Sequence, residues 1–124
     1  MMELTINGQV YQFNFGMGFL REANKTVSMP VEGMNGMKKD VGARYLIAQV
    51  LDGEVDSLVD LLDIANKGQN PRVTKALLDS YIDDQETNID ELFEKTKDFL
   101  SKANATRKMM AKMQEAIDEM KMQD

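Results

Sequence analysis

The last third of the chain, residues 89–122, constrains the fold more than any other stretch. It contains no glycine or proline and is rich in residues that favour helices. Apolar or small side chains recur there at alternating spacings of four and three residues, as they do on one face of a helix. The series is Leu92, Thr96, Phe99, Ala103, Thr106, Met110, Met113, Ile117 and Met120.

A continuous helix over residues 89–122 would be about 51 Å long. A compact chain of 124 residues is roughly 35 Å across. The helix is therefore expected either to break or to project beyond the body. Asn104-Ala105-Thr106 contains two weak helix formers and is a candidate joint. We predict a single domain made of a body, residues 1–104, and a C-terminal helical extension, residues 105–124.

The two halves of this apolar face differ in width. Phe93 and Leu100 broaden the first half, which suits packing on a globular body. From Thr106 onward the face narrows toward the two-in-seven seam of paired helices and becomes rich in methionine, a side chain common in adaptable binding surfaces. Binding of a partner or a second copy and packing in the domain's own core both remain open. The candidate partner-binding residues are Met109, Met110, Met113, Ile117 and Met120.

The N-terminal segment predicts a β-hairpin. Two runs of alternating apolar and polar residues are joined by Asn7-Gly8, the preferred pair for a type I′ turn. This turn pairs Ile6 with Gln9, Leu4 with Tyr11 and Met2 with Phe13. It gathers apolar side chains on one face, which a helix is expected to cover.

Four further helices are predicted, over residues 17–25, 41–52, 54–67 and 71–83. The helix over 41–52 is apolar nearly all round, so we expect it to be the buried central helix, with Asp40 as its N-cap. The helix over 54–67 has one apolar stripe and is expected at the surface. Asn70-Pro71 is expected to begin the helix that ends near Asp83.

Two connections carry specific expectations. Residues 28–39 contain Pro30, Gly33 and Gly36 and predict an irregular loop, either a functional or mobile segment or an ordinary surface loop. Asn88 is expected to cap the last helix, with Glu91 reaching back to it. The predicted fold is α+β and predominantly α-helical, with an N-terminal β-hairpin packed on about five helices and a long C-terminal helix.

The composition argues against several classes of function. The net charge is −6, and no basic cluster is longer than a pair, so nucleic-acid binding is not expected. No apolar run approaches 18 residues, so no membrane association is expected. The chain has neither histidine nor cysteine, the commonest catalytic bases, nucleophiles and zinc ligands. We therefore predict that the protein is not an enzyme and that it has no catalytic residue, cofactor or metal ion.

An acidic stretch from Asp79 to Glu94 invites a calcium interpretation. An EF-hand loop started at Asp83 would place Glu94 correctly at its twelfth position. It would also require ligands at Gln85 and Thr87 and a glycine at Asn88, so the match fails. A solvated acidic corner between two helices is the interpretation we adopt.

Many short motifs, in order along nearly the whole chain, resemble the tail assembly chaperones of long-tailed phages and prophages of Gram-positive bacteria. None of the motifs is catalytic, so the resemblance rests on their number and order. They are Glu3-Leu4-Thr5-Ile6-Asn7-Gly8, Tyr11-Gln12-Phe13-Asn14-Phe15-Gly16, Phe19-Leu20-Arg21-Glu22, Pro30-Val31-Glu32-Gly33, Val41-Gly42, Leu61-Leu62-Asp63-Ile64-Ala65-Asn66, Pro71-Arg72-Val73-Thr74, Asp98-Phe99-Leu100 and Lys102-Ala103-Asn104-Ala105-Thr106.

The resemblance implies a non-enzymatic chaperone that binds and solubilises the phage tape measure protein and assists tail tube assembly. It implies the tape measure protein as partner, with the tail tube protein as a further expectation. The narrow apolar seam from Thr106 onward separately leaves a homo-oligomer as a possibility. It also implies action in the host bacterial cytoplasm and absence from the mature virion. The alternative is a self-assembling structural or scaffold component of the tail. The resemblance assigns no site residues.

Overall fold

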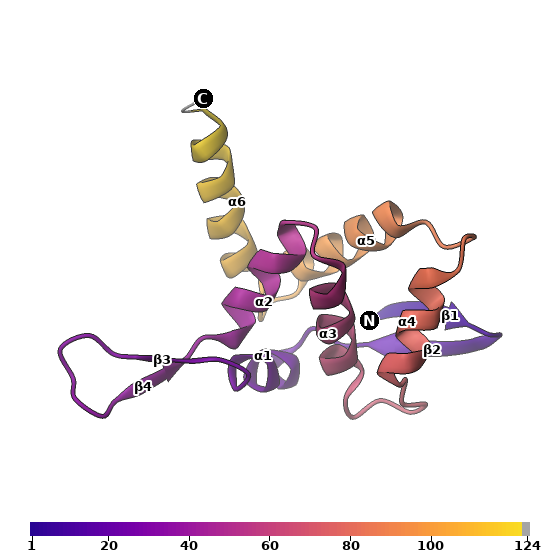
Figure 1. Ribbon diagram of the computed structural model, residues 1–124, viewed down its shortest axis with the longest axis horizontal. Coiled ribbons are helices and arrows are strands. Elements are labelled where there is room, and N and C mark those ends of the chain that lie inside the picture. Colours follow the sequence, from indigo (N-terminus) through magenta and orange to yellow (C-terminus); the bar gives the residue numbers. More distant parts are fainter. Residues whose placement is uncertain (123–124) are drawn as a thin grey trace.

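A computed structural model of the chain describes residues 1–122. Over this range it contains two antiparallel β-hairpins and six helices (Figure 1), so the predicted α+β, predominantly helical fold is confirmed. The elements are β1 (Met2–Ile6), β2 (Gln9–Phe13), α1 (Met17–Asn24), β3 (Ser28–Pro30), β4 (Lys38–Asp40), α2 (Gly42–Leu51), α3 (Val55–Asn66), α4 (Lys75–Asp83), α5 (Ile89–Lys102) and α6 (Arg107–Met122).

The first hairpin, β1–β2, has the predicted register. Ile6 lies opposite Gln9 and Met2 opposite Phe13. Asn7 and Gly8 both have positive φ, at 52° and 79°, as a type I′ turn requires. The apolar face of the hairpin is buried at Met2, Leu4, Ile6 and Phe13.

The core lies where this apolar face meets α3 and α5. Asn66 at the end of α3 donates a hydrogen bond to the carbonyl oxygen of Gln12 in β2, at 2.9 Å. On the other strand, Lys95 of α5 donates through Nζ to the carbonyl oxygen of Glu3, at 2.7 Å. The second of these hydrogen bonds holds the first strand against a helix that follows it by some ninety residues.

The central helix is α3, and our prediction that the helix over 41–52 would be central is wrong. Leu58, Leu61 and Leu62 of α3 are fully buried, and α3 packs against α1, α2, α4 and β2. In contrast, α2 leaves Tyr45 45% exposed. The apolar residues on its outer side line a surface groove instead of the core, which the sequence pattern alone does not reveal.

Two predicted helix starts are also wrong. Thr74, not Asn70, caps α4, and its hydroxyl oxygen accepts from the Leu77 amide at 3.1 Å. Residues before Thr74 are instead held by the buried Asn66, whose Oδ1 accepts from the Val73 amide at 2.7 Å. Asp40 does not cap α2, because its carboxylate accepts from the Ser28 hydroxyl at 2.8 Å.

That same contact belongs to a second hairpin where we predicted an irregular loop over residues 28–39. In β3–β4, Ser28 pairs with Asp40 and Pro30 with Lys38. Every residue of these two short strands is exposed. The hairpin extends away from the body as an arm (Figure 1). Pairing across a long turn, with little burial, leaves only a weak signal in the sequence.

The long C-terminal stretch both breaks and projects. Asn88 caps α5 by accepting from the Glu91 amide at 3.1 Å, as predicted. The helix ends at Lys102, Ala103 takes an extended conformation with ψ 131°, and α6 begins at Arg107. Figure 1 shows α6 leaving the body at an angle to α5.

Candidate functional site

Burial falls steadily along the predicted binding face of α6. Met110 is only 5% exposed and belongs to the domain core, while Met109 and Met113 pack partly against that core. Ile117 is half-buried, and Met120 is 70% exposed. The five candidate residues therefore do not form one accessible surface. Core packing accounts for Met110, and the outer part of the helix remains the candidate surface.

The start of α6 is anchored by a buried threonine. Thr106 is fully buried, and its hydroxyl donates to the carbonyl oxygen of Leu100 at 2.6 Å. The Arg107 amide donates to the carbonyl oxygen of Ala103 at 2.9 Å, which closes the turn between the two helices. The first turns of α6 also contact α2. These contacts fix the direction in which the rest of α6 projects.

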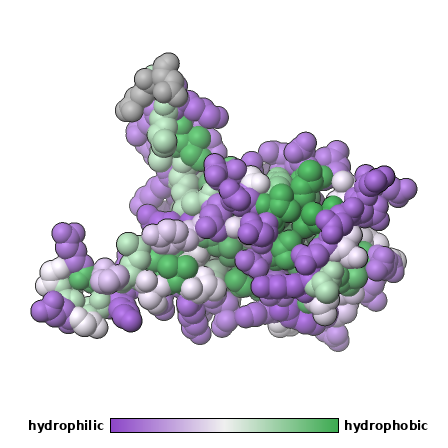
Figure 2. All heavy atoms as spheres, in the orientation of Figure 1, coloured by the Kyte–Doolittle hydropathy of each residue, from purple (hydrophilic) through white to green (hydrophobic). Residues whose placement is uncertain are grey.

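An apolar groove lies at the base of α6, between this helix, α2 and the β3–β4 arm. Its volume is about 560 Å³. Met109 of α6 and Tyr45 of α2 both line it, and the Tyr45 hydroxyl lies 3.4 Å from Sδ of Met29 in β3. The other lining residues are Asn24, Lys39, Asp40, Val41, Arg44 and Ala48. In Figure 2, hydrophobic side chains also follow α6 outward from the body.

Sequence reasoning missed the contribution of the β3–β4 arm. Met29, Met34 and Met37 are 43%, 54% and 53% exposed, and Met29 lines the groove. The available signal was three methionines within nine residues, in the segment already identified as a candidate functional loop. The structure thus places exposed methionines on two projecting elements that share one groove.

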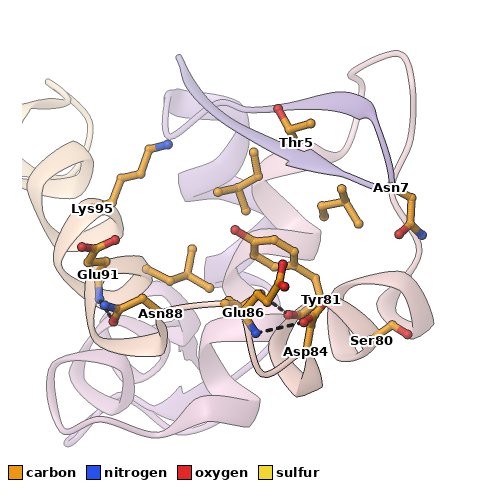
Figure 3. Close-up of a pocket in the computed structure, with 13 residues that line it drawn as sticks. Thr5, Asn7, Ser80, Tyr81, Asp84, Glu86, Asn88, Glu91 and Lys95 are labelled. Carbon is orange, nitrogen blue, oxygen red and sulfur yellow. Dashed lines mark hydrogen bonds between the residues drawn. The ribbon is translucent and has the colours of Figure 1, made fainter.

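A second pocket, of about 520 Å³, lies under the β1–β2 hairpin (Figure 3). Tyr81 points into it from α4, and the rim is polar, with Thr5, Glu86 and Lys95. The Thr87 hydroxyl donates to the Tyr81 carbonyl oxygen at 2.6 Å, and the Asp84 carboxylate accepts from the Glu86 amide at 2.9 Å. These bonds order the loop between α4 and α5.

Within residues 1–122, no group of three or more acidic, histidine or cysteine side chains is placed to hold a metal ion. Lys75 of α4 has a raised pKa because the Asp60 carboxylate accepts a hydrogen bond from it and attracts its charge. A raised pKa keeps this lysine protonated, so it offers no neutral amine for nucleophilic chemistry. None of the helices described over this range is long and apolar enough to span a membrane.

The remaining evidence comes from comparison with known proteins. A model of the family described as phage tail assembly chaperone protein, TAC, matches residues 3–115. The match runs from the first strand into α6. No curated protein matches the chain. No solved structure matches it either. The family match covers most of the chain, and the protein therefore belongs to the phage tail assembly chaperone family.

Proposed function

We propose that this chaperone binds a helical segment of the phage tape measure protein, keeps it soluble and assists tail tube assembly. It acts without enzymatic chemistry, in the host cytoplasm, and leaves before the particle matures. The observation that supports this proposal is the partly exposed apolar face of the outer half of α6, together with the groove at the base of the helix that is lined by Met29, Tyr45 and Met109.

The shape and chemistry of this surface suit an amphipathic helix. A helix docks by placing apolar side chains three and four residues apart into a hydrophobic groove. Methionine adapts to such side chains because it is unbranched and flexible, so one surface accepts several related sequences. A long helical protein presents many such segments. The β3–β4 arm and α6 offer methionines on two sides of the groove.

Co-expression with the tape measure protein tests this proposal. The wild-type chain should raise the soluble fraction of the tape measure protein. A chain carrying both Met29→Ser and Met120→Ser should lose most of this effect, because both side chains are exposed and contribute to the proposed surface. Met17→Ser is the matched control, since Met17 is 48% exposed on α1 and does not line the groove.

The possible outcomes test the binding surface and the identity of the partner separately. If the double variant rescues as well as wild type, this surface is not the binding site. If the wild-type chain fails to rescue, the tape measure protein is not the partner. Mass spectrometry of purified particles tests departure from the tail, because a stoichiometric amount of the chain in the virion would instead make it a structural component.

A further inference from the structure

Met109, Met113, Ala116 and Met120 form a line along α6, at spacings of four, three and four residues. The line begins in the groove with Met109 and ends with Met120, which is 70% exposed. Met110 lies beside the line and is turned into the body. The spacing is that of an a/d seam between two helices. We call these four residues the seam.

The basic residues at the start of α6 oppose the dipole of this helix. Its first half carries Arg107, Lys108 and Lys112 with no acidic residue, whereas Glu115, Asp118 and Glu119 follow in the second half, with Lys121 in the last turn. The helix dipole favours the opposite order, acidic residues first and basic residues last. Helix α5 follows that rule at both ends, with two acidic residues in its first turn and Lys102 in its last, whereas α6 follows it only in its last turn.

The spacing of like charges along α6 also destabilises this helix. Lys108 and Lys112 lie four residues apart, as do Glu115 and Glu119, and like charges at this spacing destabilise a helix. None of the ion pairs found within residues 1–122 involves a charged side chain of α6. These charges therefore gain little inside the molecule, whereas they match a second helix that runs in the opposite direction.

We propose that two copies of this chain pair through the seams of their α6 helices in an antiparallel arrangement. Met113 of each copy then packs against Ala116 of the other, and Met109 against Met120. On one flank of the seam, Lys112 of each copy faces Glu119 of the other. A parallel pair would instead place Lys112 against Ile117 of the other copy and would leave it without an opposite charge. The contact between Lys112 and Glu119 occurs twice, related by a two-fold axis, so the assembly is a closed dimer.

The groove at the base of α6 is placed to receive the α6 helix of the second copy. In the antiparallel pair, the outer end of α6 from the second copy lies over the groove at the base of the first. That end carries Asp118 and Glu119 beside Lys121, and the groove has the basic side chains of Lys39 and Arg44 on its rim, beside Asp40. The charges on the approaching end and on the rim are thus largely complementary, which favours this orientation over others. This pairing needs only the free chain and does not rest on the proposed function.

Sedimentation velocity on the whole chain tests the pairing and its contacts. The wild-type chain should be a dimer that dissociates on dilution. Lys112→Glu and Glu119→Lys should each weaken the dimer about tenfold, because each replaces two attractive contacts by two repulsive ones. The double variant should restore it. Arg107→Glu is the control, since Arg107 lies on the same helix but on the side away from the seam, and it should leave the dimer intact.

Cross-linking tests the orientation. The chain has no cysteine, so introduced cysteines give no background. A mixture of Lys112→Cys and Glu119→Cys chains should form the mixed disulfide, with little of either homodimer. A wild-type chain that stays monomeric at all concentrations overturns the proposal. So does a dimer that is indifferent to both charge reversals, or preferential 112-to-112 cross-linking. Circular dichroism confirms that each variant is folded.

Discussion

Thr106 donates its hydroxyl hydrogen to the carbonyl oxygen of Leu100 at 2.6 Å, across the break between α5 and α6. Both residues are fully buried. The carbonyl lies in the last turn of α5, where the residue four positions further on is no longer helical. One side chain thus satisfies a buried acceptor and holds the start of the projecting helix.

Thr106→Val should destabilise the protein by about 1–3 kcal/mol, because it keeps the shape of the side chain but leaves the Leu100 carbonyl without this donor. Urea denaturation measures the change. Thr96→Val is the matched control. Thr96 is equally buried, but its hydroxyl donates to the Leu92 carbonyl within α5, and the helix backbone continues to bond that carbonyl. Equal losses in the two variants would contradict the proposed role of Thr106.

Gly42→Ala should be among the most disruptive single changes in the chain. A Cβ at Gly42 would overlap the Ala23 carbonyl oxygen and the Thr26 hydroxyl, and the first of these is backbone that cannot rotate away. Separation of α1 from α2 is the expected consequence, with a loss of at least about 3 kcal/mol. Thermal unfolding measures it.

Gly18→Ala provides the control for Gly42→Ala. A Cβ at Gly18, in α1, meets nothing within 4 Å. Alanine is the better helix former by about 1 kcal/mol, so this variant should be as stable as wild type or more so. A Gly42→Ala chain with an unchanged melting temperature would show that α1 and α2 are not held at the distance described.

Asn66→Asp should cost about 2 kcal/mol or more of stability at neutral pH. The fully buried amide of Asn66 donates to the carbonyl oxygens of Gln12 and Pro71 and accepts from Val73. Aspartate has nearly the same shape but no amide donor, and it brings a charge into the core, where only Arg72 is placed to offset it. Asn70→Asp, at an exposed position, should have little effect. Chemical denaturation of both variants at one pH makes the comparison.

Met110→Ala and Met120→Ala should differ sharply although both lie on α6. Truncating the buried Met110 should cost about 2–5 kcal/mol, the usual range for a methionine in a core. Truncating the exposed Met120 should change the stability of the monomer, measured at protein concentrations too low for the proposed pairing, by less than about 0.5 kcal/mol. Similar losses would mean that the outer half of α6 also packs on the body. Differential scanning fluorimetry ranks the two variants quickly.

Local rules predicted the elements with strong local signals. The Asn7-Gly8 turn determined the register of β1–β2, and the Asn88 cap located the start of α5, because both depend on neighbouring residues alone. The failures came where tertiary contacts decide. The α2 pattern suggested a central helix, yet Tyr45 lines a groove, and Asp40 bonds Ser28 across a hairpin instead of capping α2.

For the candidate site, the sequence located the apolar face of the last helix but not the boundary between its buried and exposed parts. Alternation at four and three residues identified the apolar face of α6, but that spacing is shared by helices that pack inward and helices that bind outward. The division between Met110 and Met120 depends on where the body ends, which the break at residues 103–106 determines. The contribution of Met29 required a hairpin that pairs it with Lys39, across a turn that the sequence pattern does not indicate.

The burial of the first strand beneath α5 has a consequence for the order in which the molecule assembles. Met2 is fully buried, and the Thr96 hydroxyl lies 3.9 Å from its sulfur. During synthesis β1 leaves the ribosome well before α5, which covers part of its apolar face. Until α5 has been made, the nascent hairpin has only the cover that α3 provides, and a hairpin is marginal in water on its own. The contact between the first strand and α5 therefore forms late, when some ninety further residues have followed that strand.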